Sequence, residues 1–240
     1  ERFYKDLDFG TGGLRSILGV GSNRMNKYNT RRATQAMANT VLSKNIENPT
    51  ACVSYDSRNF SEEFSKEVAS VFAANGIKTY VFETLTPVPF LSFSVKYKKA
   101  SAGVFITASH NPPMYNGFKA FWSNAAQVTP PEDGQIIESY NGLTNWEDIK
   151  HIDFEQGIKE GLIEWMDAET IEAYYQTVES RIKNPSMCKN EGSKLNIVFT
   201  PIHGTGKVPC EAIAARLGFT NFNTVPEQAE PNGDFPTVTS

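Results

Sequence analysis

The 240-residue sequence has no apolar run long enough to cross a bilayer, few cysteines and little net charge. A membrane-spanning helix needs about 20 consecutive apolar residues, so we predict no membrane partner. The formal net charge of −4 argues against a nucleic-acid partner, because nucleic-acid binders carry basic surfaces. Cys52, Cys188 and Cys210 are odd in number and widely spaced. They predict reduced thiols and a cytoplasmic location in place of a disulfide framework or a metal site.

The composition is otherwise that of a folded globular protein. Apolar residues make up 40% of the chain and charged residues 21%, as in ordinary globular domains. The length allows one large domain or two smaller ones. The chain begins at Glu1 without a methionine and closes on Thr239 and Ser240 without a terminating element. We therefore expect it to be a piece of a longer polypeptide.

Acidic residues are missing from two stretches, residues 9–46 and 84–131, and are concentrated in a third. Residues 132–181 carry 13 acidic residues against three basic ones. Removing carboxylates from a segment raises the local potential and attracts small anions without making the whole protein basic. The alternative is a chance clustering of solvated surface charges.

Residues 104–122 predict two strands joined by a stiff loop that carries Ser109. The apolar residues 104–106 are typical of a buried strand, and the prolines at 112 and 113 end it. Asn116-Gly117 is a turn signal, after which residues 118–122 read as a second strand. Such loops often hold reactive side chains. The alternative is an ordinary solvated connection.

The glycine-rich stretch near the N-terminus predicts a flexible turn or an anion-binding nest. Glycines at 10, 12, 13, 19 and 21 allow positive φ and close approach of backbone amides to an anion. The stretch lacks the Gly-Lys-Ser/Thr ending of a Walker loop and the third glycine of a dinucleotide fingerprint. The pattern alone leaves the turn and the nest as alternatives.

The rest of the chain alternates short apolar runs with helical periods, which predicts an α/β fold. A buried strand at 51–55 precedes Asp56-Ser57-Arg58, where open sheets place ligand groups; Arg58 is equally compatible with an ordinary surface role. Helices are expected at 30–46, from a Ser61 cap to Asn75, and at 90–99, with a strand at 78–83.

The second half repeats this order, which indicates a duplicated domain. A helix is expected from Asp167, with a stripe at helical spacing that predicts core: Ile171, Tyr174, Val178 and Ile182. A strand at 195–199, a helix at 208–217 and another strand follow. His203, in the loop between them, is interpreted as a structural residue.

Residues 107–119 resemble the phosphoserine signature of the α-D-phosphohexomutases, the family of phosphoglucomutase and phosphomannomutase. That pattern is T-A-S-H-N-P-x-x-Y-N-G-x-K, and the sequence matches its specified positions without a gap. Residues 9–32 resemble the family's F-G-T-x-G-x-R segment, with Arg15 at the place of an active-site arginine. The D-x-R at Arg58 and residues 200–204 and 231–236 are also similar to family segments, so the resemblance covers nearly the whole chain.

The resemblance implies duplicated three-layer α/β/α domains with mostly parallel, mixed sheets. Residues 1–160 would form domain I and carry the phosphoserine loop, and residues 161–240 would begin domain II, incomplete at its C-terminus. The implied activity is that of an isomerase. It would move phosphate between positions 1 and 6 of a hexose phosphate through a phosphoserine and a sugar bisphosphate. By this resemblance Ser109 would carry the phosphate, Lys119 would act as general acid and base, and His110 would orient and donate to the phosphate.

The resemblance also implies a binding set and cofactors. The phosphate- or substrate-binding residues would be Arg15, Arg58, Thr11 and Asn111. Mg²⁺ would bind Ser109 through its phosphate, and a glucose 1,6-bisphosphate-type compound would act as activator. The family's D-x-D-x-D metal loop has no counterpart in this sequence. The remaining domains of the same polypeptide would supply it, and we expect the 240 residues alone to be inactive.

Three other readings stay open. A phosphopentomutase or a sugar-bisphosphate synthase of the same family would share these motifs, because the loops that select the sugar lie outside this chain. A relative that binds sugar phosphates without catalysis would also keep the fold. A purely structural α/β domain is a third reading, for which the two acid-free stretches would have no purpose.

Overall fold

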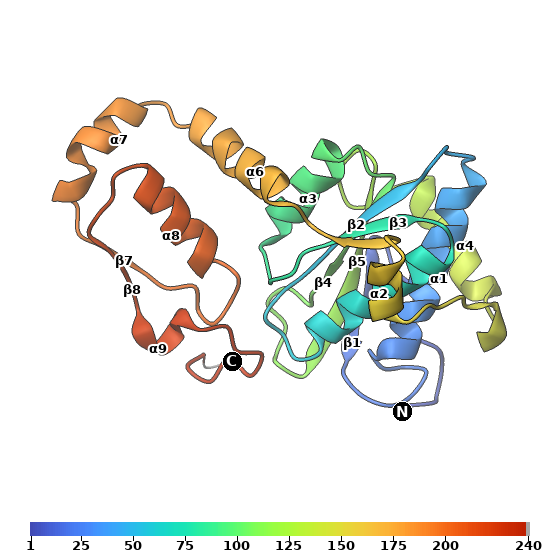
Figure 1. Cartoon of the computed structure of the whole chain (residues 1–240). Coiled ribbons are helices and arrows are strands. Elements are labelled where there is room, and N and C mark those ends of the chain that lie inside the picture. The colour runs from blue at the N-terminus through green and yellow to red at the C-terminus, as the bar shows by residue number, and fades with distance from the viewer. Residues whose placement is uncertain (239–240) are drawn as a thin grey trace. The chain divides into compact units, whose positions relative to one another are not determined.

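The computed structural model describes residues 1–238 and divides the chain into two compact units, Glu1–Met166 and from Asp167 onward (Figure 1). The first unit is built on a six-stranded sheet in the order β1-β5-β4-β2-β3-β6. The strands are β1 Gly13–Ile17, β2 Thr50–Tyr55, β3 Lys78–Val81, β4 Ala102–Ile106, β5 Tyr115–Trp122 and β6 Ile163–Trp165. Strands β2, β3, β4 and β6 run parallel, and β5 is antiparallel to β4 and β1. The predicted mixed, mostly parallel sheet is confirmed.

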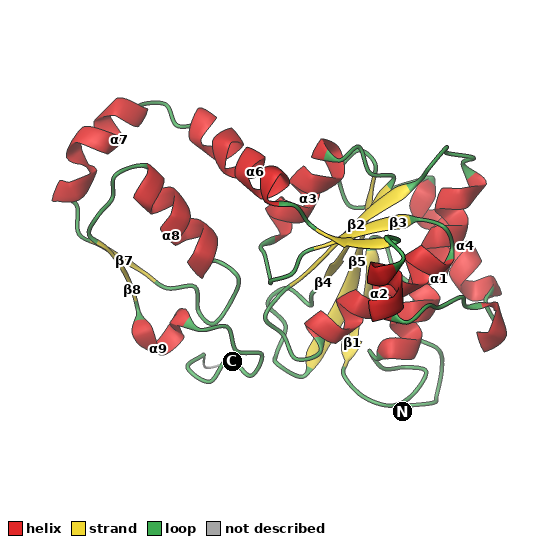
Figure 2. Ribbon diagram, in the orientation of Figure 1, coloured by secondary structure: helices red, strands yellow, loops and turns green. Residues whose placement is uncertain are grey.

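Helices cover both faces of this sheet, which gives three layers (Figure 2). The helices are α1 Lys27–Ser43, α2 Ser61–Ala74, α3 Val88–Tyr97, α4 Glu132–Gly142, the 3-10 turn η1 Trp146–Asp148 and α5 Phe154–Lys159. Val104 of β4 belongs to the core formed with α1, α2 and α4. The next residue back, Gly103, faces α3, because a Cβ there would lie 2.6 Å from Val95. Successive strand residues thus supply the two cores.

Two local expectations are wrong in instructive ways. The glycine-rich segment expected as a turn contains the strand β1, whose register pairs Gly13 with Lys119 and Arg15 with Gly117. Ser61 does not cap α2; Phe60, at φ +65°, holds the cap position. The Ser61 hydroxyl donates to Asp56 Oδ1 at 2.8 Å instead, because a buried carboxylate needs donors.

The sheet of the first unit continues beyond residue 160, since β6 pairs with β3. Helix α1 begins three residues before the expected position, because Asn26 Oδ1 accepts hydrogen bonds from the N–H groups of Tyr28 and Asn29. Within residues 1–238, none of the helices is long and apolar enough to span a membrane.

The second unit contains a two-stranded parallel sheet, β7 with β8. Its elements are α6 Ala168–Ser180, α7 Pro185–Glu191, the 3-10 turn η2 Gly192–Lys194, β7 Ile197–Phe199, α8 Lys207–Arg216, β8 Phe222–Thr224 and α9 Pro226–Ala229. The predicted strand-helix-strand order is confirmed. His203 is buried between the Glu230 carbonyl, 3.0 Å from Nδ1, and the Thr237 hydroxyl, 2.9 Å from Nε2, as a structural residue would be.

Helix α6 starts where the sequence predicts, since Asp167 Oδ1 accepts from the Thr170 N–H at 2.7 Å. The four residues of the stripe expected in the core are less buried than predicted. They are only partly covered, and the buried residues of α6 are Thr170 and Tyr175.

Candidate active site

The serine loop, residues 107–114, leaves the carboxyl end of β4 beside the carboxyl end of β2. The two strands are parallel neighbours that pair Tyr55 with Ile106. The Asp56 N–H then donates to the Ile106 carbonyl at 3.2 Å. This edge of an open sheet is where side chains from successive loops converge.

Ser109 is exposed on this loop and adopts φ +58°. The left-handed region is costly for a residue with a Cβ, on the order of 1–3 kcal/mol. Its N–H donates to Thr107 Oγ1 at 2.8 Å, and its Oγ lies 3.2 Å from His110 Nδ1. The loop thus presents a hydroxyl beside an imidazole, with both side chains open to solvent.

Arg15 reaches the loop from the edge strand β1. Its Nη1 donates to Asn111 Oδ1 at 2.9 Å, and its side chain stays exposed. The strands come this close because Gly117, opposite Arg15, has no side chain. A Cβ at Gly117 would lie 2.6 Å from the Thr107 carbonyl oxygen and 2.7 Å from that of Leu14.

Lys119 is half-buried on β5, two residues after Gly117 and therefore on the same face of the sheet. Burial lowers the pKa of Lys119, and the positive charge of Arg15 lowers it further, while Asp56 acts in the opposite direction. A lysine in such surroundings holds its proton less tightly and can act as an acid or base.

Arg58 is 4% exposed and turns toward the backbone of the serine loop. Its Nη2 donates to the Ser109 carbonyl at 2.8 Å and to that of Asn111, and its Nη1 to the carbonyls of Pro112 at 3.0 Å and Tyr115 at 3.1 Å. Its Nε lies 3.6 Å from Asp56 Oδ2. These contacts hold the loop, and phosphate binding by Arg58 stays a prediction.

A polar network that the sequence analysis did not identify supports Arg58. Burial raises the pKa of Asp56, whereas hydrogen bonds from the Thr107 side chain, the Arg58 N–H and the Ser61 hydroxyl lower it. Asn116 is fully buried and donates to Ser61 Oγ at 2.9 Å. The signal in the sequence is a set of polar residues placed directly at strand ends.

Thr11 comes two residues before Gly13, the β1 residue that pairs with Lys119. It is exposed in the turn before β1, and the next residue, Gly12, accepts from the Ala120 N–H at 2.9 Å. The serine loop adjoins Gly117, whose carbonyl accepts a hydrogen bond from the Thr107 N–H at 3.0 Å. The register therefore sets Thr11 toward the far half of β5.

The site combines three cationic side chains, Arg15, Arg58 and Lys119, with the single carboxylate of Asp56. The charge of Arg15 reaches both other cations, since it adds to burial in lowering the pKa of Arg58 as well as that of Lys119. An excess of positive charge beside an exposed hydroxyl favours a phosphate group there.

The described residues do not fit a magnesium site by themselves. Mg²⁺ takes six oxygen ligands in near-octahedral geometry, and among residues 1–238 no group of three or more His, Cys, Asp or Glu side chains is arranged to hold a metal. The carboxylate at the site, Asp56, already accepts hydrogen bonds from Arg58 and Ser61.

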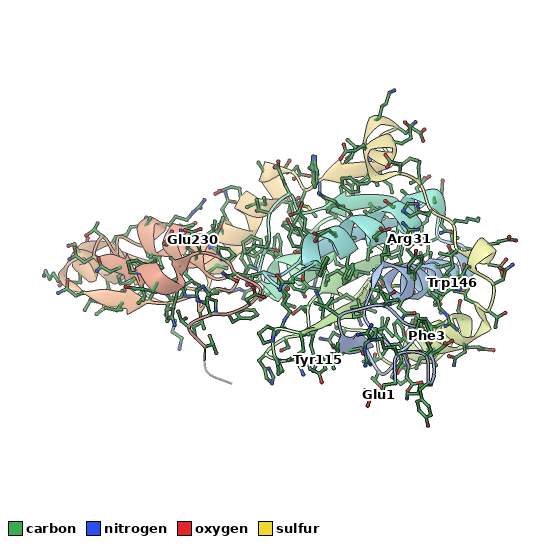
Figure 3. The ribbon with its side chains drawn as sticks, turned by 90° about the horizontal axis from the view of Figure 1, so that it is seen from below. Glu1, Phe3, Arg31, Tyr115, Trp146 and Glu230 are labelled. Carbon is green, nitrogen blue, oxygen red and sulfur yellow. The ribbon has the colours of Figure 1, made fainter. Side chains whose placement is uncertain are left out.

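A separate hollow of about 540 Å³ is lined by Phe3, Tyr28, Arg31 and Trp146. Figure 3 shows Phe3, Arg31 and Trp146 gathered at one end of the first unit, away from Tyr115 at the end of the serine loop. The Tyr28 and Trp146 rings meet edge to face at 5.8 Å. Among its lining residues, Arg31 is the one cationic side chain, in contrast to the three around Ser109.

Two protein-family profiles match the chain. The profile for phosphoglucomutase/phosphomannomutase, alpha/beta/alpha domain I, matches residues 6–146, and that for alpha/beta/alpha domain II matches residues 172–240. Together they cover most of both units. The solved structures with the same fold include parafusin, a phosphoglucomutase from Paramecium, at TM-score 0.75, with 20% identity over 99% of this chain and 46% of that one. A phosphoglucomutase/phosphomannomutase family protein from Burkholderia thailandensis gives a TM-score of 0.70 at 18% identity, over 94% of this chain and 44% of that one.

Relatives by sequence carry different mutase names. A phosphoglucomutase from Staphylococcus saprophyticus is 34% identical over 97% of this chain and 41% of its own length. A phosphoribomutase from Saccharomyces cerevisiae is 33% identical over 99% of this chain and 40% of its length. A human phosphopentomutase is 31% identical over 97% and 39%. The chain thus spans about two fifths of the length of the curated relatives it matches.

Proposed function

The chain belongs to the phosphoglucomutase/phosphomannomutase family, and from this premise we propose that its protein transfers a phosphoryl group between two hydroxyls of one sugar phosphate through a phosphoserine at Ser109. The observation that carries the proposal is the exposed Ser109 hydroxyl at a strand end, beside His110 and within a cluster of cations. A serine ester holds a phosphoryl group between two transfers, because it is inert to water until charge on the phosphate is neutralised.

In the forward step, the bond between Ser109 Oγ and phosphorus breaks and a bond from phosphorus to a sugar hydroxyl oxygen forms. The hydroxyl proton passes to the neutral amine of Lys119, a form that its lowered pKa favours. The leaving Ser109 oxygen takes a proton, for which His110 Nδ1, 3.2 Å away, is placed. The product is a sugar bisphosphate, and the reverse step returns its other phosphoryl group to Ser109.

Arg15 is the proposed ligand of the phosphoryl oxygens. Its exposed guanidinium is held at the loop by Asn111, and a planar guanidinium can donate two parallel hydrogen bonds to a phosphate. A glucose 1,6-bisphosphate-type compound would phosphorylate an empty Ser109 by the same chemistry, and so act as activator. When bound, Mg²⁺ would neutralise charge on the phosphoserine, with Ser109 as a ligand through its phosphate.

The proposed substrate is a hexose phosphate, with exchange between positions 1 and 6. A second candidate, a pentose phosphate, is favoured by one observation: the yeast and human relatives are named as phosphoribomutase and phosphopentomutase. We also propose a cytoplasmic location. Within residues 1–238 the three cysteines form no disulfide, as in reducing compartments.

The test uses the natural gene product, because the matched relatives extend well beyond this chain. Its intact mass would show one phosphate, mapped by peptide sequencing to Ser109, and coupled assays would compare glucose, mannose and ribose 1-phosphates. Ser109→Ala should abolish turnover, whereas Ser123→Ala, an exposed serine in the turn after β5, should not. An active Ser109→Ala protein would rule out the phosphoserine. A wild type inactive on all three sugars would rule out the proposed transfer and leave a binding protein without catalysis.

A further inference from the structure

The guanidinium of Arg58 is surrounded by backbone carbonyls of the loop that carries the reactive serine. Ser109, Asn111, Pro112 and Tyr115 all direct their carbonyl oxygens to its two terminal nitrogens, between 2.5 and 3.1 Å away. These acceptors span the loop from its serine to the first residue of β5, whose position Figure 3 labels. One side chain therefore fixes the loop along nearly its whole length.

The other hydrogen bonds of the loop each hold one point of it. Within the loop, the Asn111 N–H donates to the Ala108 carbonyl at 3.2 Å, and at its end the Tyr115 N–H donates to the Pro112 carbonyl at 3.0 Å. Pro112 and Pro113 lack an N–H, so neither can donate a backbone hydrogen bond that would hold the loop. Ser109 is also held at φ +58°, a conformation that persists only where surrounding contacts enforce it. The carbonyl of this same residue is one of the four acceptors of Arg58, so Arg58 contacts the backbone at the strained position.

Asp56 and the residues bound to it hold Arg58 in place. The Arg58 N–H donates to Asp56 Oδ1 at 3.0 Å, and its Nε faces Oδ2 of the same carboxylate at 3.6 Å. Asp56 is in turn bound by Ser61, which Asn116 contacts from β5. The guanidinium is thus aimed by a chain of buried polar groups that joins β2, α2 and β5.

We propose that Arg58 is a positioning residue for Ser109, which holds the reactive hydroxyl in place by binding the carbonyls of the serine loop instead of binding the substrate's phosphate. The proposal rests on the phosphoserine function assigned to Ser109 above. It separates two roles of one cation. The fork of five N–H donors sets the loop geometry, and the buried positive charge lies directly behind the group that becomes phosphorylated.

Two substitutions in the natural gene product separate the role of the donors from the role of the charge. Arg58→Lys keeps the charge but gives three donors on one atom, which cannot reach four separated carbonyls. Arg58→Met removes charge and donors. Both should lower kcat by about 100-fold, the usual effect of misplacing a reacting group by roughly 1 Å. The KM for the sugar phosphate should stay within about threefold, since uniform binding is unchanged.

Phosphorus NMR measures the pKa of the phosphoserine, which reports on the charge of residue 58 separately from its hydrogen bonds. The second pKa of a phosphoserine is about 6. Arg58→Met should raise that pKa, because a positive charge that favours the dianion is gone, whereas Arg58→Lys should leave it close to wild type. Methylguanidinium added to Arg58→Ala should restore part of kcat but should do nothing for Ser109→Ala.

Arg32 provides a matched control. It is 7% exposed, donates from Nε to the Tyr140 carbonyl at 3.1 Å and pairs with Asp6, partners outside the serine loop. Arg32→Met should lower the melting temperature as much as Arg58→Met while kcat stays within about twofold of wild type. If Arg58→Met fails to fold, Arg58→Lys and its kcat decide the question.

Three results would overturn the proposal. Arg58→Lys with wild-type kcat would mean that charge alone matters. A raised KM with unchanged kcat in either variant would mean that Arg58 binds the substrate. A Ser109 Cα chemical shift that is the same in Arg58→Met and wild type would mean that the loop does not depend on Arg58. This last measurement needs no activity, so it remains decisive even if the wild type turns over no sugar phosphate.

Discussion

Arg15 donates from Nη1 to Asn111 Oδ1 over 2.9 Å, although the two residues are 96 positions apart in the chain. The bond joins the edge strand β1 to the serine loop. It also fixes the site of a positive charge that acts on Lys119 and on Arg58.

Replacing Arg15 should change the pH dependence of turnover. Burial first, and the charge of Arg15 second, lower the pKa of Lys119, so Arg15→Met should raise it. If the neutral amine of Lys119 accepts the substrate proton, kcat rises with pH through that pKa, and a higher pKa moves the rise to higher pH. The measurement is kcat against pH for the natural gene product. Arg24→Met, in the same acid-free stretch, should leave the profile in place; an unmoved profile in Arg15→Met would contradict the assignment.

Asn111 and Thr11 are both predicted to bind substrate or phosphate, and they lie on different segments, Asn111 in the serine loop and Thr11 in the turn before β1. Asn111→Ala removes the acceptor that holds Arg15, a hydrogen bond to a charged group that contributes about 1.5–3 kcal/mol. We expect a fall in kcat/KM of at least about tenfold. Thr11→Ala should stay within about twofold, since the register sets Thr11 toward the far half of β5. Equal losses in the two variants would place Thr11 at the site after all.

Asp56 should titrate above the ordinary range of an aspartate. Burial raises its pKa, and the charge of Arg58 is among the groups that lower it, so Arg58→Met should raise it further. Carbon NMR of labelled aspartate during a pH titration measures both. The folded state binds this proton more tightly than the unfolded chain. The stability due to Asp56 is therefore present below about pH 4 and is lost as pH rises through the folded pKa. A titration at or below the ordinary value of 3.8 would refute this.

The serine loop could be predicted from the sequence because its causes are local. The apolar run that makes β4 and the prolines that follow it lie within a few residues of Ser109. The helix at Asp167 was predicted for the same reason, since its cap bonds a residue three positions away. The turn expected at Asn116-Gly117 is wrong, because β5 begins at Tyr115 and both residues pair with β1 inside the strand.

The direction of Arg58 could not be predicted, because its acceptors lie 51 to 57 residues along the chain. The pattern D-x-R marks the residue as polar and close to a strand end, without showing whether it turns to solvent or to the loop. Strand β1 was missed for a related reason. Its glycines look like a turn, and only pairing with β5 across about 100 residues makes them a strand.

Gly117 is the residue on which the close approach of β1, β4 and β5 depends. A Cβ there would lie 2.6 Å from the Thr107 carbonyl oxygen and 2.7 Å from the Leu14 carbonyl oxygen. Both are backbone atoms, one at the start of the serine loop and one in β1, so neither can move without disturbing the loop or the strand. Gly117→Ala should lower the free energy of unfolding by about 1–3 kcal/mol, the usual cost of overpacking, as measured by urea denaturation.

Gly134 on α4 is the matched control, because a Cβ there would meet no atom within 4 Å. Gly134→Ala should stabilise the protein by about 0.5–1 kcal/mol, since alanine loses less backbone entropy in a helix. The same methyl group should therefore act with opposite signs at the two positions. Gly117→Ala should also lower kcat, because Thr107, which binds the Ser109 N–H, must shift. If Gly117→Ala kept wild-type stability and kcat, the strands would not need to approach this closely, and Arg15 would not depend on that approach to reach the serine loop.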